Sequence, residues 1–493
     1  MNIFRQAAQC GAGAVAVMTM AGGCAVGPNF VRPVPPEADR YTGAPQIAAT
    51  VAADGRAQSF TPGGRIAGDW WRLFGAAGLD DAVRKAISNN ATLEAAEANL
   101  RQSQDNMRAG YGVFYPQAQA GLSATRQLSA PLQQGLGTGG SIFNVFTASG
   151  AISYTFDVFG GKRRAVEALR AQADSQRYET KAAYLALSGN VVNTCIARAG
   201  YAEEIRATRQ LIDLETQQLR LTEAQFRSGT VPYANVLVVR GQISLYQASL
   251  APLEQSASQA AHLLAMLEGV TPSQAGLPDI DLSTLTLPVD LPLSLPSELV
   301  NQRPDILSAG ALMHAAGANI GAATAAMLPS FSLSGTYGGA SSTLANLSAV
   351  SKFWSVGPTV TTPIFQGNSL WYTRRASIDA WQQTRALYRQ TVLAAFQQVA
   401  DSLKGLEHDA EALQAQVEGK RAAGEALALT RDNYQAGLVA YLDVLTAGTQ
   451  FQTATIAYAQ AVAQRHQDTV ALFVALGGGW WNVERAGGKG GAW

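Results

Sequence analysis

Four segments of the chain place apolar or small residues at every second position, with serine, threonine or glutamine between them. The alternating apolar residues are Ala118, Ala120, Leu122 and Ala124; Phe146, Ala148, Ile152, Tyr154 and Phe156; Phe331, Leu333 and Tyr337; and Trp354, Val356 and Val360. A two-residue period predicts β-strands. Runs of about ten residues with uncharged polar partners are typical of strands between lipid and a wet lumen. The alternative is a half-buried soluble sheet, which usually carries more charge on its polar face.

A three- to four-residue period replaces this alternation in two long segments. Residues 162–227 contain no proline and repeat apolar residues at helical spacing, which predicts a helix of about 100 Å. Residues 369–436 are also free of proline. Gly229 and Gly437 stand where helix stop signals belong, and a second helix is expected after each. Pro252 is expected to kink one of these second helices.

The same pattern is written twice along the chain. Residues 226–237 recur as residues 434–445, with glycine, tyrosine, valine and leucine kept at one offset. Each half is therefore predicted to run helix, strand, strand, long helix, turn, helix. We assign residues 67–280 to the first repeat and 281–478 to the second.

Three further segments complete the predicted organisation. Residues 24–66 are expected to be an extended N-terminal segment. The proline-rich residues 271–304 are predicted to form a linker outside the core. Residues 479–493 are predicted to be a flexible glycine-rich tail, with loose order expected already from Gly477.

The N-terminus has the pattern of a targeting signal. Arg5 is followed by a small, apolar stretch and then by Ala21-Gly22-Gly23-Cys24. We interpret residues 1–23 as a lipoprotein signal peptide and Cys24 as the site of lipid attachment; a plain secretory signal is the alternative. No other stretch reaches about 18 continuous apolar residues, so no membrane-spanning helix is expected.

Composition excludes several classes of function. Lys+Arg and Asp+Glu both number 36, which argues against a nucleic-acid partner. No nucleophile–base pair, carboxylate dyad or metal-ligand spacing is visible, so we predict no enzyme activity, no cofactor and no metal site. Hydrophobic residues make up 47% and charged residues only 15%, against roughly 25% in soluble domains. This deficit suggests surface that faces neither bulk water nor a compact core.

Four strands cannot close a barrel, and an open sheet edge in a bilayer leaves backbone groups unpaired. The chain must therefore assemble with copies of itself. Two copies would give eight strands and an interior filled by side chains, and three would leave a lumen. The sequence alone does not choose between them.

The chain resembles the outer-membrane efflux protein family of TolC-like channel-tunnels, and within it the OprM/NodT-like lipoprotein branch. The residues that carry the resemblance are Cys24 to Pro33, Trp70-Trp71-Arg72-Leu73-Phe74, Leu295 to Leu299, Arg303-Pro304-Asp305-Ile306 and Leu328-Pro329-Ser330. The resemblance implies a mixed α and β membrane protein, a homotrimer with a 12-stranded β-barrel, four strands per chain. A long periplasmic α-helical barrel and a mixed equatorial domain would continue it. The implied location is the bacterial outer membrane, with the lipid-anchored chain extending into the periplasm.

The resemblance also implies partners and site residues. The partners are a periplasmic adaptor protein, an inner-membrane RND-type transporter and outer-membrane lipid. Tyr434, Leu442 and Asp443 fall at the periplasmic aperture. Three copies of Asp443 would form an acidic, cation-selective ring, although Asp443 is equally well placed to cap a helix N-terminus. Gln435 and Val439 replace basic residues of some relatives, so a charge-paired lock is not expected.

Two other groups of residues are candidates for surface contacts. The expected adaptor contacts at the hairpin tips are Gly229, Thr230, Val231, Pro232, Gly437, Leu438 and Val439. The alternative is that these residues merely end the helices. The basic residues that begin the long helices either meet lipid headgroups or form solvated clusters: Lys162, Arg163, Arg164, Arg374 and Arg375.

The function that these features favour is the passive outer-membrane exit duct of a tripartite efflux system for drugs or other small molecules. The outlet of a type I protein-secretion system is the nearest alternative. A structural coiled-coil lipoprotein is less consistent with the four alternating strands.

Overall fold

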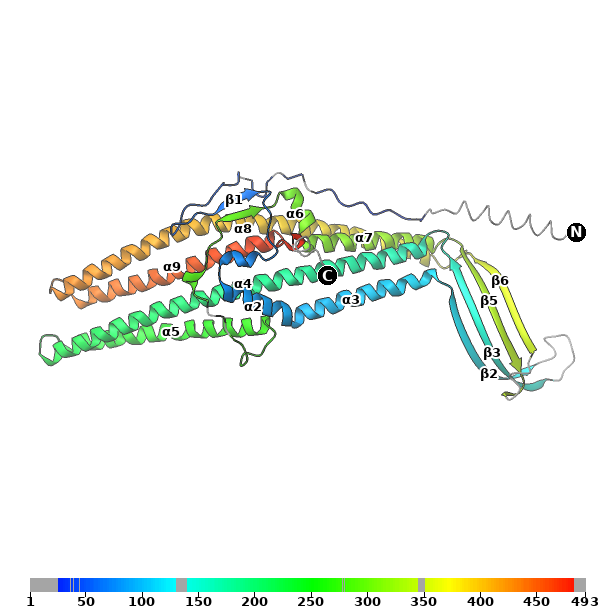
Figure 1. The fold of residues 1–493 in the computed structure, drawn as a ribbon, viewed down its shortest axis with the longest axis horizontal. Coiled ribbons are helices and arrows are strands. Elements are labelled where there is room, and N and C mark those ends of the chain that lie inside the picture. Colours follow the sequence, from blue (N-terminus) through cyan, green and yellow to red (C-terminus); the bar gives the residue numbers. More distant parts are fainter. Residues whose placement is uncertain are drawn as a thin grey trace. The chain divides into compact units, whose positions relative to one another are not determined.

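The computed structural model describes residues 25–35, 37–38, 40–43, 45–129, 140–276, 278, 280–344 and 351–482. Its elements, in chain order, are β1 (Ser59–Pro62), η1 (Trp70–Phe74), α2 (Ala77–Asn89), α3 (Ala91–Gly110), η2 (Tyr111–Phe114), β2 (Gln117–Ser129), β3 (Ser141–Phe156), α4 (Gly161–Arg227), α5 (Tyr233–Leu267), η4 (Leu282–Thr284), β4 (Asp290–Leu293), α6 (Pro296–Gln302), α7 (Pro304–Ala325), β5 (Ser330–Ser341), β6 (Ser351–Thr361), α8 (Ser369–Gln435) and α9 (Tyr441–Ala475) (Figure 1).

The chain divides into two compact units. The strand unit comprises Met1–Pro33, Leu100–Ser175 and Ala309–Tyr388. The hairpin unit comprises Val34–Asn99, Gln176–Ser308 and Arg389–Trp493. Helices α3, α4, α7 and α8 contribute residues to both units.

The internal duplication is confirmed by the order and length of the elements. Both long helices, α4 and α8, have 67 residues, and both following helices, α5 and α9, have 35. Each half runs helix, strand, strand, long helix, turn, helix, as the sequence predicts. Pro252 lies inside α5, which continues through it.

The strand unit contains one antiparallel sheet in the order β2-β3-β5-β6. Tyr154 lies opposite Leu333, and Leu333 lies opposite Pro358, so the apolar residues of neighbouring strands share one face. That face is open: Leu122 is 83% exposed and Trp354 74%. A half-buried soluble sheet would cover its apolar face with other parts of the chain. Among the described residues nothing does so, which favours a face turned to lipid.

The proline-rich segment 271–304 is part of the core of the hairpin unit, so our prediction of a linker outside the core was wrong. Leucines at alternate positions let this extended chain bury one side, and its buried apolar residues are Ile280, Leu282, Leu285, Leu287, Leu291, Leu293, Leu299 and Val300. Strand β4, within this segment, pairs in parallel with β1. Prolines are tolerated because the pair has only two strands, both of them edges.

The C-terminal residues also differ from our expectation. Residues Gly477, Gly478 and Gly479 all have positive φ and turn the chain back after α9. Trp480 then donates its indole N–H to the Gln302 carbonyl at 2.9 Å, and the Lys181 ammonium lies 3.6 Å from the centre of a Trp480 ring. The chain is therefore held in place up to Asn482, and residues 483–493 lie outside the described part.

One helix of the described residues, α7, is long and apolar enough to cross a membrane by length and composition. Nearly half of its most apolar window is buried within the chain. Helices that pack in a protein core have the same character, so α7 is only weak evidence of a membrane span.

Helices α8 and α9 pack as an antiparallel hairpin, and a half-buried carboxyl group lies between them. Apolar residues on α8 are buried at helical spacing, among them Val399, Leu403 and Leu406. Asp409, on the same helix, faces Asp468 on α9. Burial, together with the hydrogen bond and charge of Asp468, raises the pKa of Asp409 to about 8, against the opposing charge of Arg465.

This raised pKa predicts how stability depends on pH. The unfolded chain releases the Asp409 proton near pH 4, whereas the folded chain keeps it until about pH 8. Between these values the unfolded state binds fewer protons, so the free energy of unfolding falls as pH rises from about 4 to about 8. We expect Asp409→Asn to unfold at a higher temperature than the wild type at pH 8, with the difference shrinking towards pH 4. Circular dichroism measures both midpoints.

The matched control is Asp401→Asn, because Asp401 is an exposed carboxylate on the same helix. A gain in stability that is the same at both pH values, or that Asp401→Asn reproduces, would refute the half-buried carboxyl pair.

Candidate functional site

The two hairpin tips are built by helix ends of the same kind. Gly229 ends α4 with φ 76°, and Gly437 ends α8 with φ 74°. The Thr230 N–H donates to Gln225 O and the Gly229 N–H to Phe226 O, both at 2.9 Å. The corresponding bonds of the second tip join Leu438 to Asn433 and Gly437 to Tyr434. This is the Schellman motif, which favours glycine at the left-handed position.

The tip residues leave apolar surface in the open. Leu438 is 73% exposed, while Val231 and Val439 are half-buried. No heavy atom lies within 4 Å of where a Cβ on Gly229 or Gly437 would stand, so only backbone conformation requires glycine there. The turns lie where the sequence predicts them, and contact of these residues with an adaptor stays a prediction.

The three predicted aperture residues lie together at the second tip. The Asp443 carboxylate accepts the Ala440 N–H at 3.0 Å, so it caps the N-terminus of α9. Both Asp443 and Leu442 are exposed, Leu442 to 67%. The Tyr434 ring packs against that of Tyr441 at 5.4 Å. The capping role of Asp443 is thus present in the structure, and its role in gating stays a prediction.

A small apolar core holds the two hairpins together just behind the tips. Its buried residues are Val239, Leu427, Tyr441, Val444, Leu445 and Ala447, with Leu219, Ile243, Tyr434 and Phe451 packed against them. These residues come from α4, α5, α8 and α9, so all four helices of the hairpin unit share this core.

A buried acid accompanies this core, and our sequence analysis did not predict it. Tyr441 on α9 donates its hydroxyl to the Glu215 carboxylate on α4 at 2.6 Å, and both residues are buried. Burial raises the pKa of Glu215, and the bond from Tyr441 and the charge of Arg431 only partly offset it. The partners are 226 residues apart in sequence, so only the fold brings them together. This bond links the first hairpin directly to the second.

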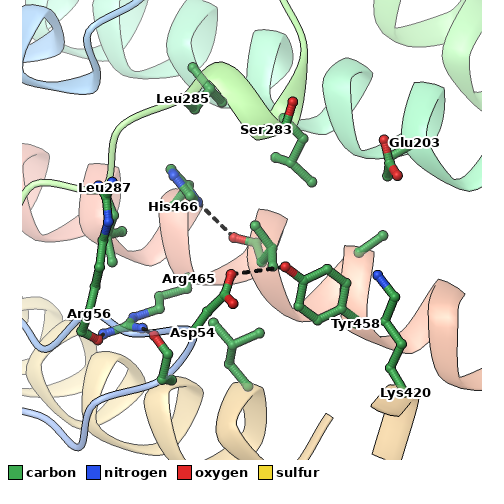
Figure 2. Close-up of a pocket in the computed structure, with 15 residues that line it drawn as sticks. Asp54, Arg56, Glu203, Ser283, Leu285, Leu287, Lys420, Tyr458, Arg465 and His466 are labelled. Atoms are coloured by element: carbon green, nitrogen blue, oxygen red, sulfur yellow. Dashed lines mark hydrogen bonds between the residues drawn. The ribbon is translucent and has the colours of Figure 1, made fainter. Parts of the chain in front are cut away.

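A cavity of about 430 Å³ lies elsewhere in the hairpin unit (Figure 2). Asp54 accepts the Tyr458 hydroxyl at 2.9 Å, and Lys420 lies over the Tyr458 ring. Arg465 is almost fully buried and donates to the carbonyls of Ala53 and Arg56, which fixes the tight turn between them. These contacts therefore hold the Ala53–Arg56 turn and the Tyr458 ring in place.

Two further titratable side chains, the Cys195 thiol and the His466 imidazole, are buried and have shifted pKa values. Burial raises the pKa of the Cys195 thiol to about 12, which keeps it protonated and unreactive. Burial also lowers the pKa of His466, whose Nδ1 contacts the Val462 carbonyl. No group of three or more possible metal ligands is found among the described residues. Cys24, the predicted site of lipid attachment, lies outside the described residues.

Comparison with known proteins agrees with this geometry. The outer membrane efflux protein family matches residues 82–270 and 295–478. The pyoverdine export outer membrane protein OpmQ of Pseudomonas aeruginosa is 29% identical over 415 residues, which cover 83% of this chain and 87% of OpmQ. Outer membrane protein OprJ of the same species is 27% identical over 479 residues, covering 95% and 96%. The solved structure of the outer-membrane channel OprN shares the fold, with TM-score 0.82, 24% identity and coverage of 93% and 100%.

The hydrogen bond between Tyr441 and Glu215 predicts that its removal lowers the stability of the fold. Tyr441→Phe leaves a buried carboxyl group without its donor, so we expect the free energy of unfolding to fall by about 1–3 kcal/mol. Tyr458→Phe is the matched control on the same helix, because its hydroxyl donates to the exposed Asp54. The control should cost about 0.5–1 kcal/mol. Urea unfolding followed by circular dichroism compares the two, and equal losses would contradict the buried bond.

Proposed function

The chain belongs to the outer membrane efflux protein family, and we propose that three copies of it form the exit duct of an RND-type tripartite pump. It is an outer-membrane channel component of a tripartite efflux system. The duct passes drugs or other small molecules from the periplasm to the exterior without chemistry of its own. Its relative OpmQ is named for the export of pyoverdine, which supports a small-molecule cargo over a secreted protein.

The observation that carries this proposal is the open sheet of the strand unit. Its two outer strands, β2 and β6, each have one neighbour, and its apolar face is exposed. In a bilayer, the free edges leave N–H and C=O groups without partners at several kcal/mol each. Pairing β6 of one copy with β2 of the next satisfies both edges and closes a barrel.

The internal repeat supplies the register of that closure. Strand β6 is the repeat counterpart of β3, and β2 is the counterpart of β5, so β6 should meet the next copy's β2 as β3 meets β5. The sequence matches between the halves place Val360 where Tyr154 stands and Ala120 where Leu333 stands. Tyr154 and Leu333 lie opposite each other. We therefore place Val360 opposite Ala120 of the next copy, which keeps the apolar face continuous.

The number of copies follows from the need for a lumen. Two copies of a four-stranded sheet close a barrel whose interior side chains fill, whereas three copies leave an open channel. A homotrimer is therefore the assembly that can act as a duct. Lipid on Cys24 would fasten each copy to the outer membrane.

The hairpin tips are the surfaces we assign to the partners. Leu438 and Leu442 are exposed there, and Gly229 to Pro232 form the corresponding turn of the first hairpin. We assign both turns to the periplasmic adaptor, which joins the duct to the inner-membrane transporter. Tyr434, Leu442 and Asp443 of three copies would line the aperture.

The register of closure is open to a cross-linking test. Cells producing Val360→Cys together with Ala120→Cys are treated with a short thiol cross-linker. We expect covalent ladders that end at the trimer, because residues directly opposite have Cβ atoms about 4.5–5.5 Å apart. The control pair, Val360→Cys with Gln119→Cys, points to opposite faces and should not cross-link. A ladder that ends at the dimer would refute the trimer, and cross-links in the control pair alone would refute the register.

The proposed role of Asp443 in ion selectivity is tested by Asp443→Asn. Asparagine keeps an oxygen that can accept the Ala440 N–H, so the helix cap survives while the charge is lost. We expect single-channel recordings of the wild type to show a cation preference that weakens in the variant. Unchanged selectivity would remove Asp443 from the gate and leave it as a cap.

A further inference from the structure

The first residues after Cys24 are bound tightly to the strand unit. We call Ala25–Phe30 the strap. The Val26 N–H donates to Phe159 O at 3.0 Å. Arg164, near the start of α4 and only 4% exposed, donates to the carbonyls of Val26 and Gly27 and to Asn29 Oδ1 at 2.6 Å. A buried arginine that donates three hydrogen bonds to one short segment holds that segment in one place.

Glycines allow the strap to approach the helices closely. Gly27 has φ 95°, and a Cβ there would stand 2.4 Å from the Cα of Gly321 on α7. A Cβ on Gly321 would in turn stand 2.7 Å from Val26 O and from Arg164 Cγ. Gly160, with φ 77°, has Ala25 equally close. The strap therefore fits a groove that larger residues would fill.

A second set of contacts fixes the far end of the strap. The Phe30 ring stacks on His314 of α7 with centres 4.3 Å apart. His314 Nε2 and Arg164 Nη1 both contact the Glu167 carboxylate at 2.8 Å. Burial opposes ionisation of Glu167, but these bonds outweigh it and lower its pKa. The ionised carboxylate thus links the arginine to the histidine that carries the strap.

The second repeat has no such arrangement. The position 208 residues after Arg164 is Tyr372, which is 60% exposed, and the position after Glu167 is Arg375. The linked group of Arg164, Glu167 and His314 is therefore not a requirement of the repeated fold. Arg164 and Glu167 hold the strap from α4 of the first repeat, while His314 and Gly321 contact it or its partners from α7 of the second.

We propose that Arg164, Glu167 and His314 form an anchor-positioning site, which fixes the lipidated N-terminus at the junction of β3 and α4. The acyl chains on Cys24 then lie against the lipid-facing sides of β3 and β5. This rests on the proposed lipid anchor. Ala25, the residue that follows Cys24 in the sequence, packs on Gly160, four residues after the end of β3.

The lipid-facing side of these two strands offers apolar surface to such chains. Ile152 is 57% exposed and Leu333 40%, while Tyr337 is 61% exposed. Acyl chains held at this point of the rim would contact β3 and β5, the two inner strands of each copy, before they meet β2 or β6. The anchor would thus be a fixed part of the barrel wall and not a loose tether.

The test uses a photoactivatable, diazirine-bearing palmitate fed to cells that make the full-length protein. The fed palmitate also enters the phospholipids around the barrel, so after irradiation mass spectrometry counts only those peptides that are cross-linked to the acylated Cys24 peptide. We expect them in β3 and β5 for the wild type. In Asn29→Ala and Gly321→Ala they should spread over all four strands. Asn29→Ala removes only a strap-side group, so the helices keep every residue. Gly317→Ala is the matched control on α7, because its Cβ would make only an ordinary contact with Trp381.

Hydrogen exchange of the Val26 amide provides an independent reading of the strap. Release of the strap should speed this exchange about tenfold or more in Asn29→Ala and leave it unchanged in Gly317→Ala. Wild-type cross-links spread evenly over the four strands would overturn the positioning site while leaving the lipid anchor intact. Failure of Cys24 to take up the label would overturn the anchor, and the site with it.

Discussion

The unpaired backbone N–H and C=O groups along the edges of β2 and β6 are the constraint on which the rest of the structure depends. A sheet of four strands with an exposed apolar face and two free edges is unstable in water and incomplete in lipid. Closure by further copies resolves both problems together. Because the repeat already pairs β3 with β5 inside the chain, the same geometry can join β6 to the next copy. The internal contact thus serves as a template for the contact between copies.

The two halves are alike in their helices and hairpin tips, and they differ in the segments that contact the N-terminal part of the chain. The paired helices have equal lengths, and both tips end in the same glycine motif. Arg164, however, has no arginine at the matching position of α8, and it is the residue that binds the strap. The leucine-rich segment around β4 likewise occurs once, and it pairs with β1 near the N-terminus. Duplication therefore produces the paired helices and strands, and the unrepeated segments add the strap and the β1–β4 pair.

Two carboxyl groups with raised pKa values lie where long helices meet. Glu215 joins α4 to α9 through Tyr441, and Asp409 faces Asp468 across α8 and α9. Such groups are costly to bury unless their partners stay in place, so they make the register of the helices specific. The surrounding contacts are apolar and non-directional, so these carboxyl groups discriminate against sliding of one helix along another. Rigid hairpins of defined register suit the contact that we propose between the tips and an adaptor.

The sequence by itself determined the elements, their order and the duplication, because strand alternation, helical periodicity and glycine stop signals are local properties. It placed the ends of α4 and α8 within a residue or two, and it located both tips. It failed for the proline-rich segment and for Gly477 to Asn482, where local composition predicts loose chain but distant side chains supply a core. Tertiary structure alone decided that Tyr441 meets Glu215 and that Arg164 holds the strap instead of meeting lipid or solvent. Those partners lie more than 100 residues apart, and no local pattern records which distant group will satisfy a buried charge.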